Sequence, residues 1–109
     1  VFCLEVFEYI YDPVTAIKNI YGCLKDGGEL YISFPFMYPH HEPVDIDFLR
    51  YTERGISKLI AEIAGFNNIN ICYRNDKSGL LEQFIRADGM HPAKNKRADI
   101  TGYLVKATK

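Results

Sequence analysis

The sequence predicts an α/β fold in which two parallel strands are joined by a crossover helix. Two apolar stretches, residues 1–6 and 29–36, are too short for helices and read as buried strands. Between them, residues 12–24 carry apolar side chains at helical spacing. Strand, helix and strand together have about the length of a right-handed βαβ unit. At 109 residues and 48% apolar content, the chain is large enough for one small domain with its own core.

The first helix has recognisable start and stop signals. Asp12 is a suitable N-cap, and Pro13 is preorganised for the first helical position. Gly27 and Gly28 permit the left-handed turn that ends the helix before the strand 29–36. The residues expected on its buried face are Ile17, Ile20, Tyr21 and Leu24.

The second half of the chain is predicted to contain a helix and two more strands. Thr52 is the expected cap of a helix that Gly65 ends. The apolar face of this helix would consist of Ile56, Leu59, Ile60, Ile63 and Ala64. Strands are expected over 68–73 and 101–107, a short helix over 80–85 and a surface loop over 89–99. No repeat or linker divides the chain, so residues 1–109 are expected to form part of one domain.

Charge and composition exclude several classes of partner. The net charge of -1 and the pI near 6.3 favour neither nucleic acid nor a membrane as a partner. The one basic cluster, Lys94, Lys96 and Arg97, is interpreted as a solvated loop. Three widely spaced cysteines predict buried thiols in a reducing compartment. Without an apolar run long enough to cross a bilayer or a charged leader, the chain is expected to be cytoplasmic.

The loop that follows the strand 29–36 holds the densest set of chemically active side chains. Ligand crevices of parallel sheets lie beyond the carboxyl ends of the strands, where this loop begins. Phe36, Met37 and Tyr38 would form an apolar wall there, and His40 and His41 would supply hydrogen bonds, as in a lid or acceptor pocket. The alternative is a solvated loop whose aromatic rings pack into the core.

A metal site is a second hypothesis for the same loop. Imidazole and carboxylate ligands suit zinc or iron. Adjacent histidines rarely bind one ion, and neither a His-Glu-x-x-His spacing nor a helical i, i+4 pair is present, so no metal is expected. The nitrogen and oxygen ligands considered are those of His40, His41, Glu42, Asp45 and Asp47. Asp47 and Arg50 are close enough to pair, which is favoured over recognition of a substrate carboxylate by Arg50.

Several of these segments, in this order, resemble one enzyme family. The stretches 3–9, 24–28 and 30–35 are similar to strand four, the Leu-Lys-Pro-Gly-Gly turn and strand five of class I S-adenosylmethionine-dependent methyltransferases. The pattern also includes Pro35, His41, Pro43, Asp47-Phe48, Arg50-Tyr51-Thr52 and Gly65-Phe66. The resemblance implies a partial Rossmann-like methyltransferase fold with an antiparallel carboxyl-terminal strand pair. Residues 1–109 would then be the carboxyl-terminal half of a single methyltransferase domain, from strand four onward.

The resemblance also implies roles for individual residues. The cofactor S-adenosylmethionine would lie over Glu5, Val6 and Phe7, and Glu8 or His41 would act as a base where the acceptor must lose a proton. A structural role for Glu8, capping or orienting backbone groups, is the alternative. Small-molecule acceptor binding would fall to Phe36, Tyr38, His40 and Arg50. The glycine-rich cofactor turn of the family lies upstream of strand four, and this chain has no Gly-x-Gly, so we expect it to bind the cofactor weakly and to be inactive alone.

A non-enzymatic function remains open beside this one. A truncated Rossmann half exposes the edge and apolar flank of its first strand, and these surfaces must be covered. The alternative function is therefore a non-catalytic module that acts through oligomerisation or partner binding. A homo-oligomer or a domain-swapped dimer would form through the exposed first strand.

Overall fold

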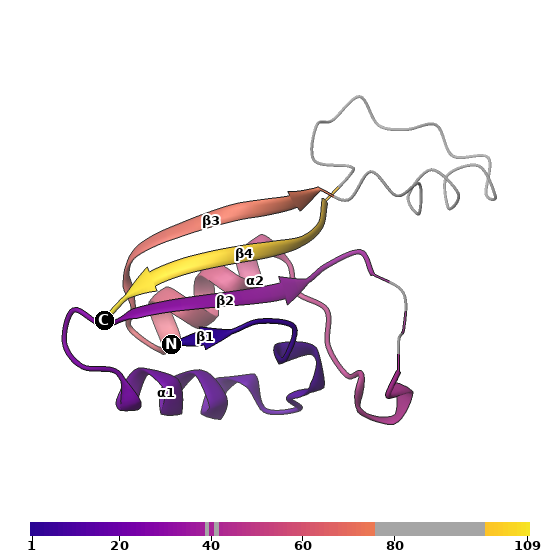
Figure 1. Ribbon diagram of the computed structural model, residues 1–109, viewed down its shortest axis with the longest axis horizontal. Coiled ribbons are helices and arrows are strands. Elements are labelled where there is room, and N and C mark those ends of the chain that lie inside the picture. The colour runs from indigo at the N-terminus through magenta and orange to yellow at the C-terminus, as the bar shows by residue number, and fades with distance from the viewer. Residues whose placement is uncertain (39, 41, 76–99) are drawn as a thin grey trace.

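The computed structural model confirms a mixed α/β fold built on one four-stranded sheet (Figure 1). It describes residues 1–38, 40, 42–75 and 100–109. The strand order is β1-β2-β4-β3, with β1 parallel to β2 and β4 antiparallel to both of its neighbours. The strands are β1 Phe2–Cys3, β2 Glu29–Pro35, β3 Asn67–Asn75 and β4 Ile100–Thr108. The helical segments are η1 Phe7–Tyr9, α1 Pro13–Cys23, η2 Val44–Ile46, α2 Glu53–Ser57 and η3 Lys58–Ile63.

Helix α1 begins and ends where the sequence signals predict. The Asp12 carboxylate accepts a hydrogen bond from the Thr15 amide at 3.1 Å, and Pro13 opens the helix. Gly27 has a φ of 75°, which confirms the left-handed turn. The Gly27 amide donates to the carbonyl of Lys109 at 2.9 Å, so this turn also holds the end of β4.

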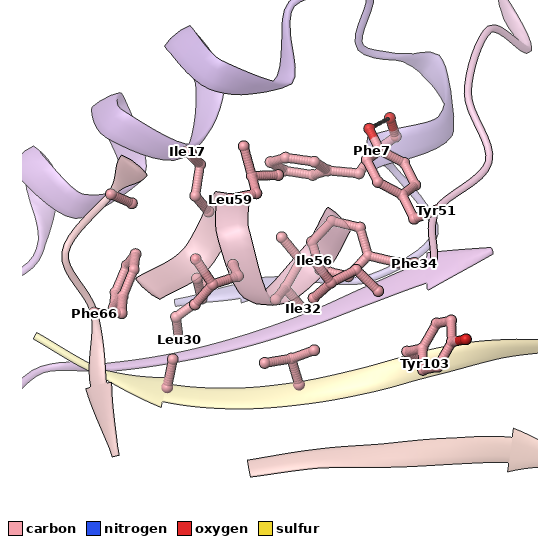
Figure 2. Close-up of a cluster of buried hydrophobic side chains, with 14 of the residues drawn as sticks. Phe7, Ile17, Leu30, Ile32, Phe34, Tyr51, Ile56, Leu59, Phe66 and Tyr103 are labelled. Carbon is pink, nitrogen blue, oxygen red and sulfur yellow. Dashed lines mark hydrogen bonds between the residues drawn. The ribbon is translucent and has the colours of Figure 1, made fainter. Parts of the chain in front are cut away.

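A hydrophobic core lies between one face of the sheet and the helices (Figure 2). Alternate residues of β2 and β4 face this core, as strand geometry requires. Helices α1 and α2 and the η3 segment cover the same face. The sheet contributes Leu30, Ile32, Phe34, Tyr103, Val105 and Ala107, and the helices contribute Ile17, Ile56, Leu59 and Ile60, followed by Ala64 at the end of η3.

Glycine allows β2 and β4 to approach closely at the carboxyl end of β2. Gly102 lies opposite Pro35, and a Cβ atom at Gly102 would stand 2.7 Å from the carbonyl oxygen of Phe34. That distance is below any ordinary contact, so an alanine there would force the two backbones apart. The tight pairing fixes the start of the loop that follows Pro35.

The first strand is shorter and more exposed than the sequence predicts. Residues 1–6 were expected to form a buried strand, but only Phe2 and Cys3 pair with β2. Glu5 adopts a φ of 54° and turns the chain away from the sheet into η1. Phe2 pairs with Tyr31 and stacks on its ring, on the face of the sheet away from the core, so Phe2 remains 76% exposed.

The prediction that the cysteines are buried is wrong. Cys23 and Cys72 are exposed, Cys3 is partly buried, and all three are free thiols. Cys72 lies opposite Leu104, on the face of the sheet that no described helix covers. Residue alternation along β3 therefore places the Cys72 side chain away from the core, whereas Cys3 packs against the core and Cys23 ends helix α1.

The second predicted helix forms, but its geometry changes along its length. The Thr52 hydroxyl caps it by accepting from the Gly55 amide at 3.1 Å, and Gly65 ends it with a φ of 87°. After α2 the backbone widens into the π-helical segment η3. The predicted strands 68–73 and 101–107 correspond to β3 and β4. The predicted helix 80–85, the loop 89–99 and the basic cluster lie outside the described residues.

Within the described residues, no helix combines the length and the apolar character that a membrane span requires.

Candidate functional site

The exits of β1 and β2 meet at one end of the sheet (Figure 1). The carbonyl oxygen of Glu8, just after β1, accepts hydrogen bonds from the amides of Phe48 at 2.9 Å and Leu49 at 3.1 Å. The Tyr51 amide donates to the carbonyl of Pro35 at 2.8 Å. The two bonds to Glu8 hold the end of the loop 36–50 against the segment 5–9, and the bond from Tyr51 to Pro35 joins the two ends of the loop. The segments that follow β1 and β2 therefore lie together beyond the carboxyl ends of these two strands.

Glu5 is held in a polar cluster at this end of the sheet. Its amide donates to the Ser33 hydroxyl oxygen at 2.7 Å, and that hydroxyl donates to the Glu5 carboxylate at 3.0 Å. The guanidinium of Arg74 forms an ion pair with the same carboxylate at 2.8 Å and lies 5.9 Å from the centroid of the Tyr38 ring. Glu5 and Tyr38 were predicted site residues, whereas Ser33 and Arg74 were not.

A signal for both of these partners is present in the sequence. Ser33 is a polar residue in the middle of the largely apolar strand β2, and Arg74 stands near the carboxyl end of β3. Since β1, β2 and β3 run in the same direction, their carboxyl ends share one edge. Reading the polar residues at all three strand ends together would have found the cluster.

Behind this cluster, Phe7, Glu8 and Tyr51 form a buried layer. The Phe7 side chain is fully buried, with its ring centroid 5.3 Å from that of Phe34. The Tyr51 hydroxyl donates to the carbonyl oxygen of Phe7 at 2.9 Å (Figure 2). Glu8 is 1% exposed. Burial, and secondly the Glu8 carboxylate, raise the pKa of Tyr51 above its ordinary value.

Tyr51→Phe is expected to lower the free energy of unfolding by about 1 kcal/mol, because the buried bond to Phe7 is lost. The raised pKa of Tyr51 means that the unfolded chain releases this proton first as the pH rises past about 10. Wild-type stability therefore falls with rising pH in that range, and the phenylalanine variant lacks this part of the fall. Urea unfolding at pH 7 and above pH 10 measures both effects.

Tyr11→Phe is the matched control, because Tyr11 is 79% exposed. It should change the free energy of unfolding by less than about 0.5 kcal/mol at pH 7. Equal losses in the two variants would contradict the assigned role of the Tyr51 hydroxyl.

The predicted pair of Asp47 and Arg50 is present and includes His40. The Arg50 guanidinium donates to both carboxylate oxygens of Asp47, each at 2.6 Å. The Nδ1 atom of His40 lies 3.1 Å from Oδ2 of the same carboxylate. The hydrogen bonds from Arg50 to Asp47 are the main cause that raises the pKa of Arg50. Burial raises the pKa of nearby Tyr9, and the charges of Glu8, Asp47 and Glu5 raise it further.

Phe36 belongs to a separate cavity at the same end of the sheet. Its ring centroid lies 5.9 Å from that of Tyr103, and both residues line an open cavity of about 550 Å³. The other lining residues are Thr52, Glu53, Arg54, Ser57 and Ile100. Tyr38, His40 and Arg50 do not line it. Of the four predicted acceptor-binding residues, Phe36 lines this cavity and the other three do not.

Two further predictions concern the loop. His41, the second candidate base, lies outside the described residues. Among the side chains that the structure describes, no group of three or more histidine, cysteine, aspartate or glutamate residues is placed to hold a metal ion. The roles assigned to individual site residues remain predictions.

The strand order β1-β2-β4-β3, with β4 antiparallel to both neighbours, can be compared with that of known structures. The chain shares the fold of part of S-adenosylmethionine-dependent methyltransferase structures. Two similar solved structures are both of phosphoethanolamine N-methyltransferase 2 from Haemonchus contortus. One, in complex with S-adenosyl-L-methionine, has a TM-score of 0.61 at 18% identity, over 100% of this chain and 32% of that one. The other, with phosphomonomethylethanolamine and S-adenosylhomocysteine, has a TM-score of 0.58 at 19% identity, over 100% of this chain and 33% of that one.

This chain thus spans about one third of the length of the structures that it matches. No protein-family model and no curated protein sequence matches it. The comparisons confirm the predicted partial methyltransferase fold.

Proposed function

We propose that this chain is the acceptor-side part of an S-adenosylmethionine-dependent methyltransferase that acts on a small molecule. The observation that carries the proposal is the strand order β1-β2-β4-β3, in which only β4 runs in the opposite direction. The whole of this chain matches part of two methyltransferase structures with that fold. The meeting of the segment 5–9 with the loop 36–50 supports it, because both follow the carboxyl ends of parallel strands. The complete domain would include upstream strands that carry the glycine-rich turn.

The residues at the exit of β1 fit one wall of a cofactor site. Val6 is 38% exposed and offers an apolar surface. The Glu5 side chain is 54% exposed, and its carboxylate would be favourable near a sulfonium cation. Phe7 is fully buried, so a cofactor would meet its backbone rather than its ring. When bound, adenosylmethionine supplies the methyl group, and its sulfur keeps the electron pair of the broken carbon–sulfur bond.

The proposed acceptor is a small molecule. One of the matching structures holds phosphomonomethylethanolamine, which is a small molecule, and the cavity beside Phe36 is open at the same end of the sheet. The atom that receives the methyl group does not follow from the fold, because one fold hosts many acceptors. The predictions that no nucleic acid or membrane is a partner, and that the protein is cytoplasmic, accompany this proposal. The three free thiols support a reducing compartment.

Calorimetric titration with adenosylhomocysteine tests the proposal. The chain of 109 residues should bind it weakly, since it has no Gly-x-Gly turn. A version extended upstream through the preceding strands should bind it tightly. Tight binding by the short chain would show that the cofactor site is misplaced, and no binding by the extended version would contradict a methyltransferase function.

A second candidate function is a non-catalytic module that oligomerises through its first strand. The observation that favours it is the exposure of β1 and its surroundings, where Phe2 is 76%, Val1 49% and Leu4 47% exposed. Sedimentation equilibrium of the 109-residue chain distinguishes the two. A stable dimer that the Phe2→Lys substitution dissociates would favour the non-catalytic module. A monomer would contradict the module and leave the methyltransferase as the remaining candidate.

A further inference from the structure

The loop 36–50 encloses a carboxylate that solvent does not reach. The Asp47 side chain is 0% exposed, yet it lies on a loop whose neighbouring side chains, such as Phe48 and Val44, are exposed. The backbone on its carboxyl-terminal side is fixed, because the amides of Phe48 and Leu49 donate to the carbonyl of Glu8. A buried charge is costly unless its partners compensate it, so the burial of Asp47 depends on the side chains that contact its carboxylate.

The Arg50 guanidinium holds the Asp47 carboxylate in place by hydrogen bonds. Both of its terminal nitrogens donate to Asp47 at 2.6 Å, in the two-pronged geometry that only arginine provides. Its Nε atom donates to the carbonyl of Tyr38 at 3.1 Å, and one terminal nitrogen also donates to the carbonyl of Leu49 at 2.9 Å. Arg50 therefore connects the Asp47 carboxylate to the backbone at Tyr38, two residues before His40.

His40 meets the same carboxylate from the other side. Its Nδ1 lies 3.1 Å from Oδ2 of Asp47, whereas its side chain is 73% exposed. An ionised carboxylate only accepts hydrogen bonds, so Nδ1 must carry the hydrogen of this contact. In the neutral ring, Nε2 then holds a free lone pair.

We propose that His40 is the proton acceptor of this site and that Asp47 is its positioning residue. This inference rests on the proposed function, because the proton comes from the methyl acceptor of the proposed methyltransferase. As the acceptor heteroatom forms its bond to the methyl carbon with its own lone pair, its proton passes to Nε2 of His40, and the ring becomes an imidazolium. Asp47 stabilises that imidazolium, and Arg50 keeps the carboxylate in place. The assignment selects His40 over His41 as the histidine base.

Nitrogen NMR of the histidine rings tests this on the 109-residue chain itself. Two-bond proton–nitrogen correlation spectra distinguish the two neutral tautomers, and His40→Gln identifies the His40 signals among the three histidines. At about pH 8.5, roughly two units above the ordinary imidazole pKa, the major form of His40 should carry its hydrogen on Nδ1. Asp47→Ala should shift the major form to Nε2–H, which free imidazole side chains prefer.

Asp45→Asn is the matched control, because it removes a carboxylate two residues away and should leave the tautomer of His40 unchanged. A major Nε2–H form in the wild-type chain would overturn the proposal, even if Asp47→Ala does not fold. The proposal would also fail if a folded Asp47→Ala variant kept the Nδ1–H form. The NMR measurement needs no cofactor, so an Nε2–H form of His40 would contradict the role of His40 and not the methyltransferase proposal. Failure to bind adenosylhomocysteine would contradict the methyltransferase proposal and not the tautomer of His40.

Discussion

Phe34→Ala is expected to lower the free energy of unfolding by about 3–5 kcal/mol. The Phe34 ring is 1% exposed and stands at the centre of an aromatic group, with ring centroids 5.3 Å from Phe7 and 4.8 Å from Tyr51. Its removal leaves a cavity between the sheet and the helices that these fixed rings cannot fill. Since a small domain has a total stability of about 5–15 kcal/mol, urea unfolding followed by circular dichroism will detect the loss clearly.

Leu104→Ala is the control for this variant. Leu104 pairs with Ser33 on β2, next to Phe34, but its side chain is 46% exposed on the opposite face of the sheet. A loss below about 1 kcal/mol is expected there, because little apolar area is buried. A larger loss at Leu104 than at Phe34 would mean that the face opposite the helices, rather than the helix-covered face, holds the core.

Local signals were sufficient to predict most of the elements of this fold. The cap at Asp12, the left-handed turn at Gly27 and the cap at Thr52 are each made by residues within a few positions of one another. Helical spacing in α1 correctly selects Ile17 for the core, because a helix repeats regardless of its neighbours. The order of these signals along the chain was then enough to predict the parallel pair β1 and β2.

Burial in the strands was harder to predict, because it depends on what lies beside each strand. An apolar run such as residues 1–6 is expected to be buried, yet Phe2 pairs with Tyr31 on the face of the sheet away from the core and stays exposed. Cys72 is likewise exposed because its face of the sheet has no described helix over it. The widening of η3 after α2 has no sequence signal that we can identify.

The candidate site shows the same division between local and distant contacts. Asp47 and Arg50 are three residues apart, so their pairing could be predicted from the sequence. The contact of Glu5 with Arg74 joins residues 69 positions apart and depends on the order of strands in the sheet. The contact of His40 with Asp47 depends on how the loop 36–50 closes, which backbone bonds to Glu8 and Pro35 determine.

Arg50→Met is expected to lower the free energy of unfolding by about 2–4 kcal/mol at neutral pH. Methionine keeps much of the volume of the arginine stem, so packing changes little. The substitution instead removes the guanidinium and leaves the fully buried Asp47 carboxylate without the two hydrogen bonds that Arg50 donates. We place the loss slightly below that of a completely buried ion pair because the Arg50 side chain is 25% exposed. Urea unfolding of the purified variant measures it.

Two further variants separate charge from geometry at this position. Arg50→Lys keeps the positive charge but not the planar fork, so it should recover only part of the stability. Arg54→Met removes an exposed arginine of α2 and should change the free energy of unfolding by less than about 0.5 kcal/mol. If Arg50→Met were as mild as Arg54→Met, Asp47 would not depend on Arg50 for its position. The loop would then be held by its backbone bonds to Glu8 and Pro35, and His40 would have to be positioned without help from Arg50.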